Sequence, residues 1–343
     1  MADDRVWLLL DGRALAGWKS VSITRSLEEA AGRFELSVSE RLQRQPRARI
    51  RSGVECAVRI GDTPMIRGYV DRVRAEIDKE QHTFTVAGRD RVADLIDCSP
   101  DVPPSEWTDV TLLELGQELA RPFGIEVIAD VDVGAPFERV ALSPGQRAFE
   151  LLEERARQRQ VLLVSDADGR LVLTRPDQSR AAPITEGVNF KRGAFEESTA
   201  ERFSLYTVKG EGFLGPEFPP PEARAKDVGV PRFRPMLIVP SGDLDEARCR
   251  ERAQWEATYR RARGERAEVT VAGWRQPSGE VWPVGARVVV DIPSLGLSGE
   301  RLISSTTFSL TNDRGTETRL VLDRPGAFEP MPETADEDDT EGF

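Results

Sequence analysis

The chain has 343 residues, of which 39% are hydrophobic, 31% charged and 7% aromatic, a composition that is typical of a folded protein and excludes a wholly disordered one. A single hydrophobic core stops growing near roughly 250 to 300 residues, so this length predicts several modules. The formal net charge of -12 argues against a nucleic-acid-binding protein, because duplex affinity comes mainly from Lys and Arg side chains that neutralise phosphates.

The N-terminal segment carries Asp3 and Asp4 where a secretory signal carries basic residues. The longest apolar runs of the chain, such as 6–10 and 161–164, are far shorter than the roughly 18 to 20 residues of a membrane helix. We therefore expect a protein that is made in the cytoplasm, stays there and has no membrane partner.

Short strand patterns follow in the first part of the chain. Polar and apolar residues alternate over 20–24 and 34–38, as they do in half-buried strands. Further strand-like runs occupy 54–60, 66–73 and 83–87, and a brief helix is expected near 90–96. Evenly spaced short strands with Gly and Pro turns predict a small β-barrel or sandwich over residues 1–98.

An arginine-rich segment interrupts this first module around Pro46. A flexible basic loop is the simpler interpretation, and a loop that binds an acidic neighbour or a nucleic-acid end is the alternative. Long loops that leave a barrel often carry binding residues. The candidate protein-interface residues are therefore Arg41, Arg44, Arg47, Arg49 and Arg51.

The pattern changes to helical periodicity after residue 99. Thr111 and Glu114 have the spacing of a capping box, and a second helix is expected to start at Ser143, with Pro144 in its first turn. Two strand-like runs then flank the acidic turn at 166–169. A calcium-binding loop would need its glycine at the sixth position, whereas Gly169 is the fourth residue from Asp166, so we favour a β-hairpin. Together these patterns predict a compact α+β module over 99–183.

Two further segments precede the last folded part. A Pro-rich stretch begins after residue 210 and is expected to run over the surface, because proline cannot join a central sheet. A charged helix over 244–263 follows, with Leu244, Ala247, Trp255 and Tyr259 on one side. We favour a solvated helix that packs on a neighbouring module over a partner-binding helix.

The last folded part repeats the first. Leu36 is followed by a strand from Gly53 to Ile60, and Val269 is followed by one from Gly285 to Ile292, with later strands at similar separations. The predicted fold class is therefore α+β and β-rich, with two related small β-barrel domains flanking the mixed module. The second barrel is assigned to 184–210 and 264–325, the Pro-rich and helical insertion to 211–263, and an acidic disordered tail to 326–343.

Few residues could support catalysis. The single histidine, His82, ends a strand-like run, and the cysteines are too scattered for a zinc site or a disulfide framework, so we interpret them as small buried hydrophobes. These cysteines are Cys56, Cys98 and Cys249. The sequence contains no phosphate loop, dinucleotide fingerprint or nucleophile elbow. We expect no enzymatic activity, no catalytic residues, no cofactor and no metal.

Several segments of the chain carry a resemblance to a known family. They are GWKSVSITRS at 17–26, AGRFEL at 31–36, GYVD at 68–71, VAGRDRVADLIDC at 86–98, FSLYTVKG at 203–210 and RPMLI at 234–238. The part from 87 to 98 is the most specific. These segments resemble the baseplate hub proteins of phage Mu and its prophage relatives. The resemblance covers about residues 12 to 328, and the acidic tail departs from it.

This resemblance implies a structural baseplate hub of a phage or phage-like contractile tail, similar in fold to the hub of T-even phages. Two barrels per subunit would give a homotrimer six barrels in a ring, which adapts the six-fold tail tube to the three-fold central spike. The implied partners are the tail tube protein, the central spike protein and other baseplate proteins, with no specific nucleic acid. The implied location is the virion tail baseplate, assembled in the bacterial host cytoplasm. The competing class is a tail-tip peptidoglycan hydrolase that uses a carboxylate pair.

Overall fold

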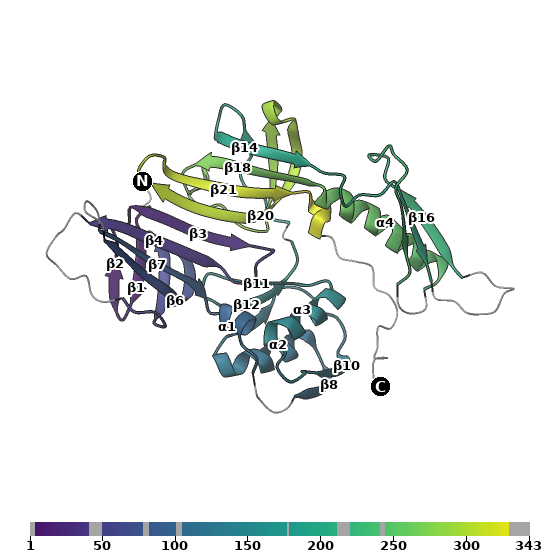
Figure 1. Cartoon of the computed structure of the whole chain (residues 1–343), viewed down its shortest axis with the longest axis horizontal. Helices are drawn as coiled ribbons and strands as arrows, with labels where there is room; N and C mark the ends of the chain where they lie inside the picture. Colours follow the sequence, from purple (N-terminus) through teal and green to yellow (C-terminus); the bar gives the residue numbers. More distant parts are fainter. Residues whose placement is uncertain are drawn as a thin grey trace.

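The computed structural model describes residues 4–40, 50–77, 82–100, 105–176, 178–210, 220–240 and 244–328, without the side chains of residues 39, 40 and 82. Strands predominate, and they form a 13-stranded sheet, a two-stranded sheet and two three-stranded sheets (Figure 1). The β-rich α+β class expected from the sequence is confirmed.

The first β unit is built from the N-terminal strands of the large sheet. Its strand order is β3-β4-β7-β6-β5-β1-β2, and every neighbouring pair is antiparallel. The strands are β1 (Val6–Leu10), β2 (Arg13–Leu15), β3 (Ser20–Ser26), β4 (Arg33–Glu40), β5 (Glu55–Ile60), β6 (Thr63–Ile77) and β7 (His82–Asp90).

The second β unit comes from the C-terminal part of the chain. Its strands are β13 (Ile184–Thr185), β14 (Phe190–Glu197), β18 (Glu265–Ala272), β19 (Arg287–Ile292), β20 (Leu297–Thr311) and β21 (Gly315–Asp323), with the short 3-10 helix η2 (Pro293–Leu295). The order β14-β18-β21-β20-β19 matches β3-β4-β7-β6-β5 strand for strand. The repeat expected from the sequence is therefore present in the strand topology.

The match extends to single backbone positions. Gly53 has a φ of 81° and Gly285 a φ of 88°, values that favour glycine. The Gly53 N–H donates to the carbonyl of Val70 at 2.7 Å, and the Gly285 N–H donates to that of Ile303 at 2.8 Å. In each unit a register shift follows that acceptor, at 70/72 and at 303/305. The two units therefore share one register, in which Val70 corresponds to Ile303.

The structure corrects the expectation of two closed barrels. Among the described strands, no pairing joins β3 to β1 or β2, and none joins β14 to β13. The outer edge of β3 instead pairs with β20 of the second unit, from Ser305 opposite Ser26 to Leu310 opposite Val21. Because this contact uses the edge that would close the first unit on itself, the two units form one continuous open sheet.

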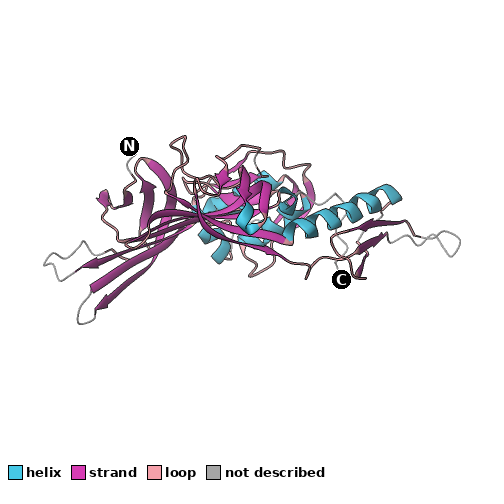
Figure 2. Ribbon diagram, turned by 90° about the horizontal axis from the view of Figure 1, so that it is seen from above, coloured by secondary structure: helices cyan, strands magenta, loops and turns pink. Residues whose placement is uncertain are grey.

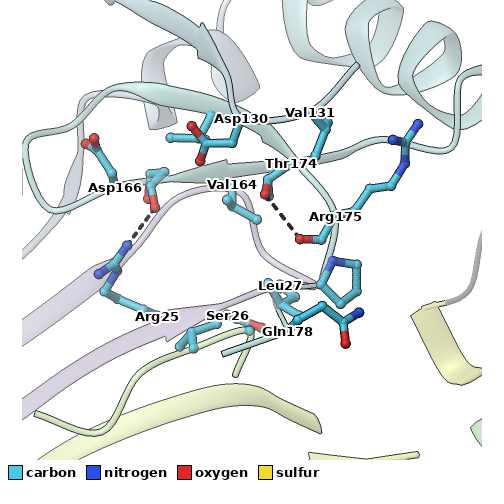
Figure 3. Close-up of a pocket in the computed structure, with 15 residues that line it drawn as sticks. Arg25, Ser26, Leu27, Asp130, Val131, Val164, Asp166, Thr174, Arg175 and Gln178 are labelled. Carbon is cyan, nitrogen blue, oxygen red and sulfur yellow. Dashed lines mark hydrogen bonds between the residues drawn. The ribbon is translucent and has the colours of Figure 1, made fainter. Parts of the chain in front are cut away.

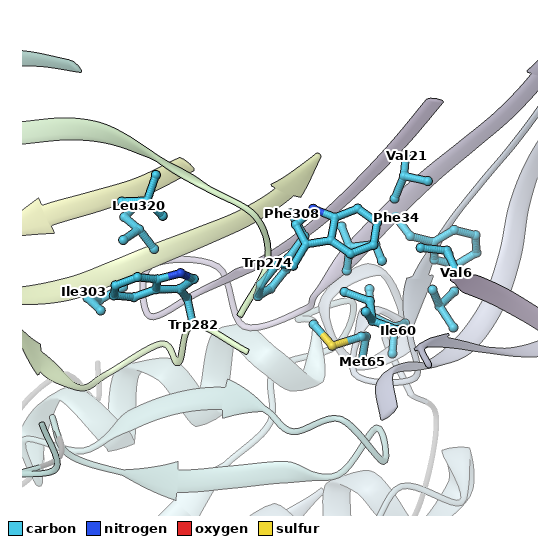
Figure 4. Packing of buried hydrophobic residues seen from close by; sticks show 14 of the residues in the cluster. Val6, Val21, Phe34, Ile60, Met65, Trp274, Trp282, Ile303, Phe308 and Leu320 are labelled. Carbon is cyan, nitrogen blue, oxygen red and sulfur yellow. The ribbon is translucent and has the colours of Figure 1, made fainter. Parts of the chain in front are cut away.

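One hydrophobic core spans the joint between the units. Trp274 is 1% exposed, and its indole N–H donates to the carbonyl of Ser309 at 2.9 Å. Figure 4 shows Trp274 and Phe308 lying between Ile303 of the second unit and Ile60 of the first. The joint is therefore packed like a domain interior and fixes the two units relative to each other.

The α+β module lies beside both units (Figure 1). The capping box predicted at Thr111 and Glu114 is confirmed. The predicted start of the second helix is wrong, because Ser143 accepts from Gln146 N–H in a turn with Gly145 at a φ of 84°, and the helix begins at Ala148. The elements are α1 (Ala93–Asp97), β8 (Glu106–Val110), α2 (Leu112–Ala120), η1 (Arg121–Phe123), β9 (Val127–Ala129), β10 (Phe137–Ala141), α3 (Ala148–Gln158), β11 (Leu162–Ser165) and β12 (Leu171–Thr174).

The hairpin predicted around the acidic turn is confirmed. Strands β11 and β12 are antiparallel, with Ser165 opposite Leu171. Asp166 accepts the backbone N–H groups of Asp168 and Arg170, both at 2.9 Å. The carboxylate therefore stabilises the turn itself.

The insertion projects from one end of the molecule (Figure 2). It contains β15 (Leu205–Lys209), β16 (Glu222–Lys226), β17 (Pro235–Ile238) and α4 (Glu246–Arg263), and the 3-10 helix η3 (Pro325–Phe328) contacts α4. Strand β15, which the sequence grouped with the second barrel, pairs instead with β16 and β17. Its segment therefore belongs to the insertion.

Helix α4 packs against this small sheet with a different face from the one expected. Cys249 and Ala253 are fully buried, whereas Ala247 is exposed. Trp255 and Tyr259 are half-buried and stack on each other at 4.6 Å between ring centroids. The predicted face was wrong because Trp255 and Tyr259 stack on each other along the helix instead of packing into the sheet.

The disordered tail was expected to start at residue 326. Residues 326–328 instead belong to η3, in which Ala327 is buried. Residues 329–343 of the expected acidic tail lie outside the described residues.

Candidate assembly surface

The arginine candidates are only partly described. Arg41, Arg44, Arg47 and Arg49 lie outside the described residues. Arg51 is exposed and follows the buried Ile50, at the point where the chain returns to the first β unit. The assignment of these residues to an interface stays a prediction.

Strand β14 and the second half of β6 each present an open edge in the large sheet. Strand β14 pairs with β18 on one side only. The second half of β6, residues 72–77, pairs with β7, while β5 reaches only as far as Tyr69 on the other side. In the described part of the chain no strand covers either edge. Unpaired backbone N–H and C=O groups on such edges are templates for strand addition by another chain.

A buried carboxylate joins the first β unit to the α+β module. Asp90 is 1% exposed and accepts hydrogen bonds from the backbone N–H groups of Gly32, at 2.5 Å, and Val92, at 3.0 Å. It also accepts from the Ser165 hydroxyl, which belongs to β11. Burial raises the pKa of Asp90 to about 6, and these hydrogen bonds oppose the rise. Asp90 thus connects three segments that are distant in the sequence.

A cleft of about 540 Å³ lies between the same modules (Figure 3). Arg25 donates to the carbonyl of Ser165 at 2.9 Å, and burial lowers the pKa of its guanidinium. Asp166 is held by the Arg170 guanidinium at 2.6 Å, and Asp130 also faces the cleft. The lining contains neither histidine nor cysteine. The charged groups here organise the junction between modules.

The base of the insertion contains a buried ion pair that the sequence did not reveal. The Nε and Nη2 atoms of Arg202 donate to the two carboxylate oxygens of Asp227 at 2.8 and 3.1 Å. Their side chains are 2% and 1% exposed. Burial alone would raise the pKa of Asp227, but the hydrogen bonds from Arg202 and Gly229 bring it below its ordinary value. The Nη1 atom of Arg202 also donates to Glu197 of β14 at 3.3 Å, so the guanidinium links the insertion to the second β unit.

Among the described residues, no group of three or more His, Cys, Asp and Glu side chains is placed to hold a metal ion. None of the helices within the described ranges is long and apolar enough to cross a membrane.

Comparisons with known proteins agree with this architecture. Family models match residues 5–90 (Mu phage baseplate assembly protein GpP-like, N-terminal), 92–175 (baseplate hub protein gp44-like, second domain) and 245–331 (Mu phage baseplate assembly protein GpP, fourth domain). The chain is 32% identical to the baseplate hub protein gp44 of Escherichia phage Mu over 340 residues, which cover 95% of this chain and 89% of that protein.

The similar solved structures include two tail proteins that match over nearly the whole chain. The 43 kDa tail protein of prophage MuSo2 from Shewanella oneidensis has a TM-score of 0.87 at 35% identity, covering 96% of this chain and 100% of that one. The tail protein from Neisseria meningitidis MC58 has a TM-score of 0.79 at 22% identity, covering 96% and 98%, and shows the same fold. The chain therefore belongs to the family of baseplate hub proteins of phage Mu and its prophage relatives.

Proposed function

We propose that the protein works as a homotrimer that adapts the six-fold tail tube to the three-fold central spike of a contractile tail. The observation that carries this proposal is the repeated strand order within one chain. Three subunits with two equivalent β units each can offer six equivalent sites, whereas every unrepeated element occurs three times. A ring that continues a six-fold tube therefore has to use the β units.

The unrepeated parts are left for three-fold partners. The α+β module and α4 would face the spike or other baseplate proteins. The segment from Arg41 to Arg51 connects two strands of a repeated β unit and would contact the tube. We place the assembled ring in the virion tail baseplate, formed in the bacterial host cytoplasm. In this proposal the protein is a structural component without catalytic activity.

Electron cryomicroscopy of the full-length chain, alone and mixed with the spike protein of its tail, tests the proposal. We expect a ring of three subunits in which both β units of each subunit lie at the same radius. A different symmetry, or β units at two radii, would overturn it.

The alternative of a tail-tip hydrolase is tested separately on cell-wall sacculi. The cleft offers Asp130 and Asp166, but Asp166 is engaged by Arg170 and by the hairpin turn. We expect the purified chain to leave sacculi intact. Solubilisation that is abolished by Asp130→Asn would favour the hydrolase.

A further inference from the structure

The joint between the two β units of one chain is a template for a joint between chains. It is formed by residues 305–310 of β20 and by β3. In the shared register, residues 305–310 correspond to 72–77 of β6, because Val70 corresponds to Ile303 and a one-residue shift follows each. Strand β3 corresponds to β14, since Val21 pairs with Leu36 as Gly193 pairs with Val269. The equivalents of both halves of the internal joint are therefore open edges.

We propose that residues 72–77 of β6 in one subunit pair antiparallel with β14 of the next subunit, in the register that the internal joint dictates. Transferring the internal pairs places Arg74 opposite Glu196, Ala75 opposite Phe195 and Ile77 opposite Gly193. The partner is thus a second copy of this chain. The proposal deepens the trimer proposed above and rests on it.

Strand direction permits this closure. Along the path β14-β18-β21-β20-β3-β4-β7-β6 every neighbouring pair is antiparallel. The two end strands therefore run in opposite directions, as an antiparallel joint around a rotation axis requires. Strand β14 lies on the outer side of the second unit and β6 on the outer side of the first (Figure 1). A closed ring would leave neither edge open.

The polar face of the proposed joint is complementary in charge. At the equivalent position of the internal joint, the hydroxyls of Thr24 and Thr307 hydrogen-bond at 3.1 Å. The proposed joint puts the exposed Arg74 opposite the exposed Glu196 at that position. Opposite charges on directly facing residues stabilise strand pairs, and like charges destabilise them. The charges therefore favour this register.

On the other face, two of the three facing positions are apolar and complementary in size, and at the third Val73 comes opposite the exposed Glu197. In the internal joint Phe308 faces Ile23, and both are buried, at 1% and 0% exposure. The proposed joint reverses the sizes, with the small Ala75 opposite the large Phe195. The neighbouring Ile77 is 77% exposed in the single chain and would gain cover opposite Gly193. An exposed isoleucine at a strand edge is thus placed where a joint would bury it.

Disulfide trapping tests the register. The full-length chain, with Cys98→Ser as background, would carry Arg74→Cys and Glu196→Cys. Directly opposite residues of antiparallel strands lie about 4.5 to 5.5 Å apart between Cα atoms, within disulfide reach. The matched control carries Glu76→Cys and Glu196→Cys, on the same face but about 7 to 8 Å apart on the diagonal. We expect covalent trimers from the first pair under mild oxidation, and on the order of tenfold less from the control.

Charge reversal gives an independent readout in variants whose exposed substitutions leave the fold intact. Arg74→Glu alone should raise the concentration at half-assembly by about tenfold or more, because three facing pairs per ring become like-charged. Adding Glu196→Arg should restore assembly.

The possible outcomes separate the joint from the trimer. The strand joint is overturned if the control pair crosslinks as efficiently as the test pair, or if neither charge reversal changes the concentration at half-assembly. Both outcomes leave the trimeric hub intact. A chain that stays monomeric at every concentration overturns the trimer and the joint together.

Discussion

The buried ion pair at the base of the insertion allows a quantitative test of what holds that segment in place. Asp227→Ala would leave the Arg202 guanidinium, whose side chain is 2% exposed, without its bidentate partner. Removing one member of a buried pair costs about 3 to 5 kcal/mol, because an uncompensated charge stays buried. Replacing both members, as Arg202→Met with Asp227→Leu, should cost far less than the sum of the single changes, because only the exposed Glu197 then loses a partner and no buried charge remains.

A geometrically matched control is available on the surface. Arg139 donates to Glu106 through the same two nitrogens, at 2.7 and 3.1 Å, but the side chains are 63% and 48% exposed. Glu106→Ala should therefore leave the free energy of unfolding almost unchanged, because solvent screens an exposed ion pair. The contrast between two pairs of equal geometry isolates the effect of burial.

Hydrogen exchange measured by mass spectrometry on peptides of β16 and α4 reports the opening free energy of the insertion itself. The pKa of Asp227 is below its ordinary value in the folded chain, so the pair stabilises the insertion above the unfolded pKa of about 3.9. That contribution is lost as the pH falls through the lower folded value. An Asp227→Ala effect equal to that of Glu106→Ala, or additive single changes, would refute the reasoning.

Three further predictions concern other parts of the chain. The pKa of Asp90 is raised to about 6, so its contribution is fully present below the unfolded pKa of about 3.9 and is lost as the pH rises through 6. Between these two pH values, the free energy of unfolding of the wild type, measured with urea, should fall by up to about 3 kcal/mol relative to that of Asp90→Asn. If the unfolding free energies of the two proteins changed equally with pH, the prediction would be wrong. Gly88→Ala would place a Cβ atom 2.0 Å from the carbonyl oxygen of Tyr69, so thermal unfolding should show a loss of about 1 to 3 kcal/mol or more. An unchanged Tm would show that the strands can separate at this point. The third prediction concerns the triple change to Glu of Arg44, Arg47 and Arg49. Electron microscopy should then show that tube assembly fails while the trimer persists. Tails that assemble normally would show that this loop does not contact the tube.

Local signals made the repeat predictable. A period-two pattern with glycine at a fixed distance before a strand can be read within a short window, and Gly53 and Gly285 both adopt the positive φ that only glycine tolerates well. Leu36 and Val269, matched by spacing alone, occupy equivalent places opposite Val86 and Leu320. These features depend on neighbours close in sequence.

Long-range pairing was not predictable in the same way. Whether the outer edge of β3 closes its own unit or binds β20 depends on residues more than 270 positions apart. Likewise, β15 has the alternation of any half-buried strand, which does not indicate the sheet it joins. The start of α3 was misplaced because the turn at Gly145 outweighed a favourable capping sequence.

The buried charges were missed for a different reason. Arginine and aspartate are mostly exposed in proteins, and this chain has 47 basic and 59 acidic residues among which to choose. Asp90 lies between two arginines in the run that most resembles the hub family, yet its partners Gly32 and Ser165 come from other segments. Only the fold shows which of these carboxylates is buried.

The two copies of the β unit differ in the polar residues on the strand edges that pair with other strands. Inside the chain, the joint between β20 and β3 is held by covalent connection and by a shared core, and its polar contact is the neutral pair Thr24 and Thr307. A joint between separate chains has no such connection, so its own residues must specify the partner and the register. Complementary charges contribute more to this specificity than to affinity. Arg74 and Glu196 stand at the equivalent positions of the open edges, where a shift by one residue would turn them to opposite faces. The divergence between two copies of one unit is therefore a physical indication of which edge is internal and which is offered to another subunit.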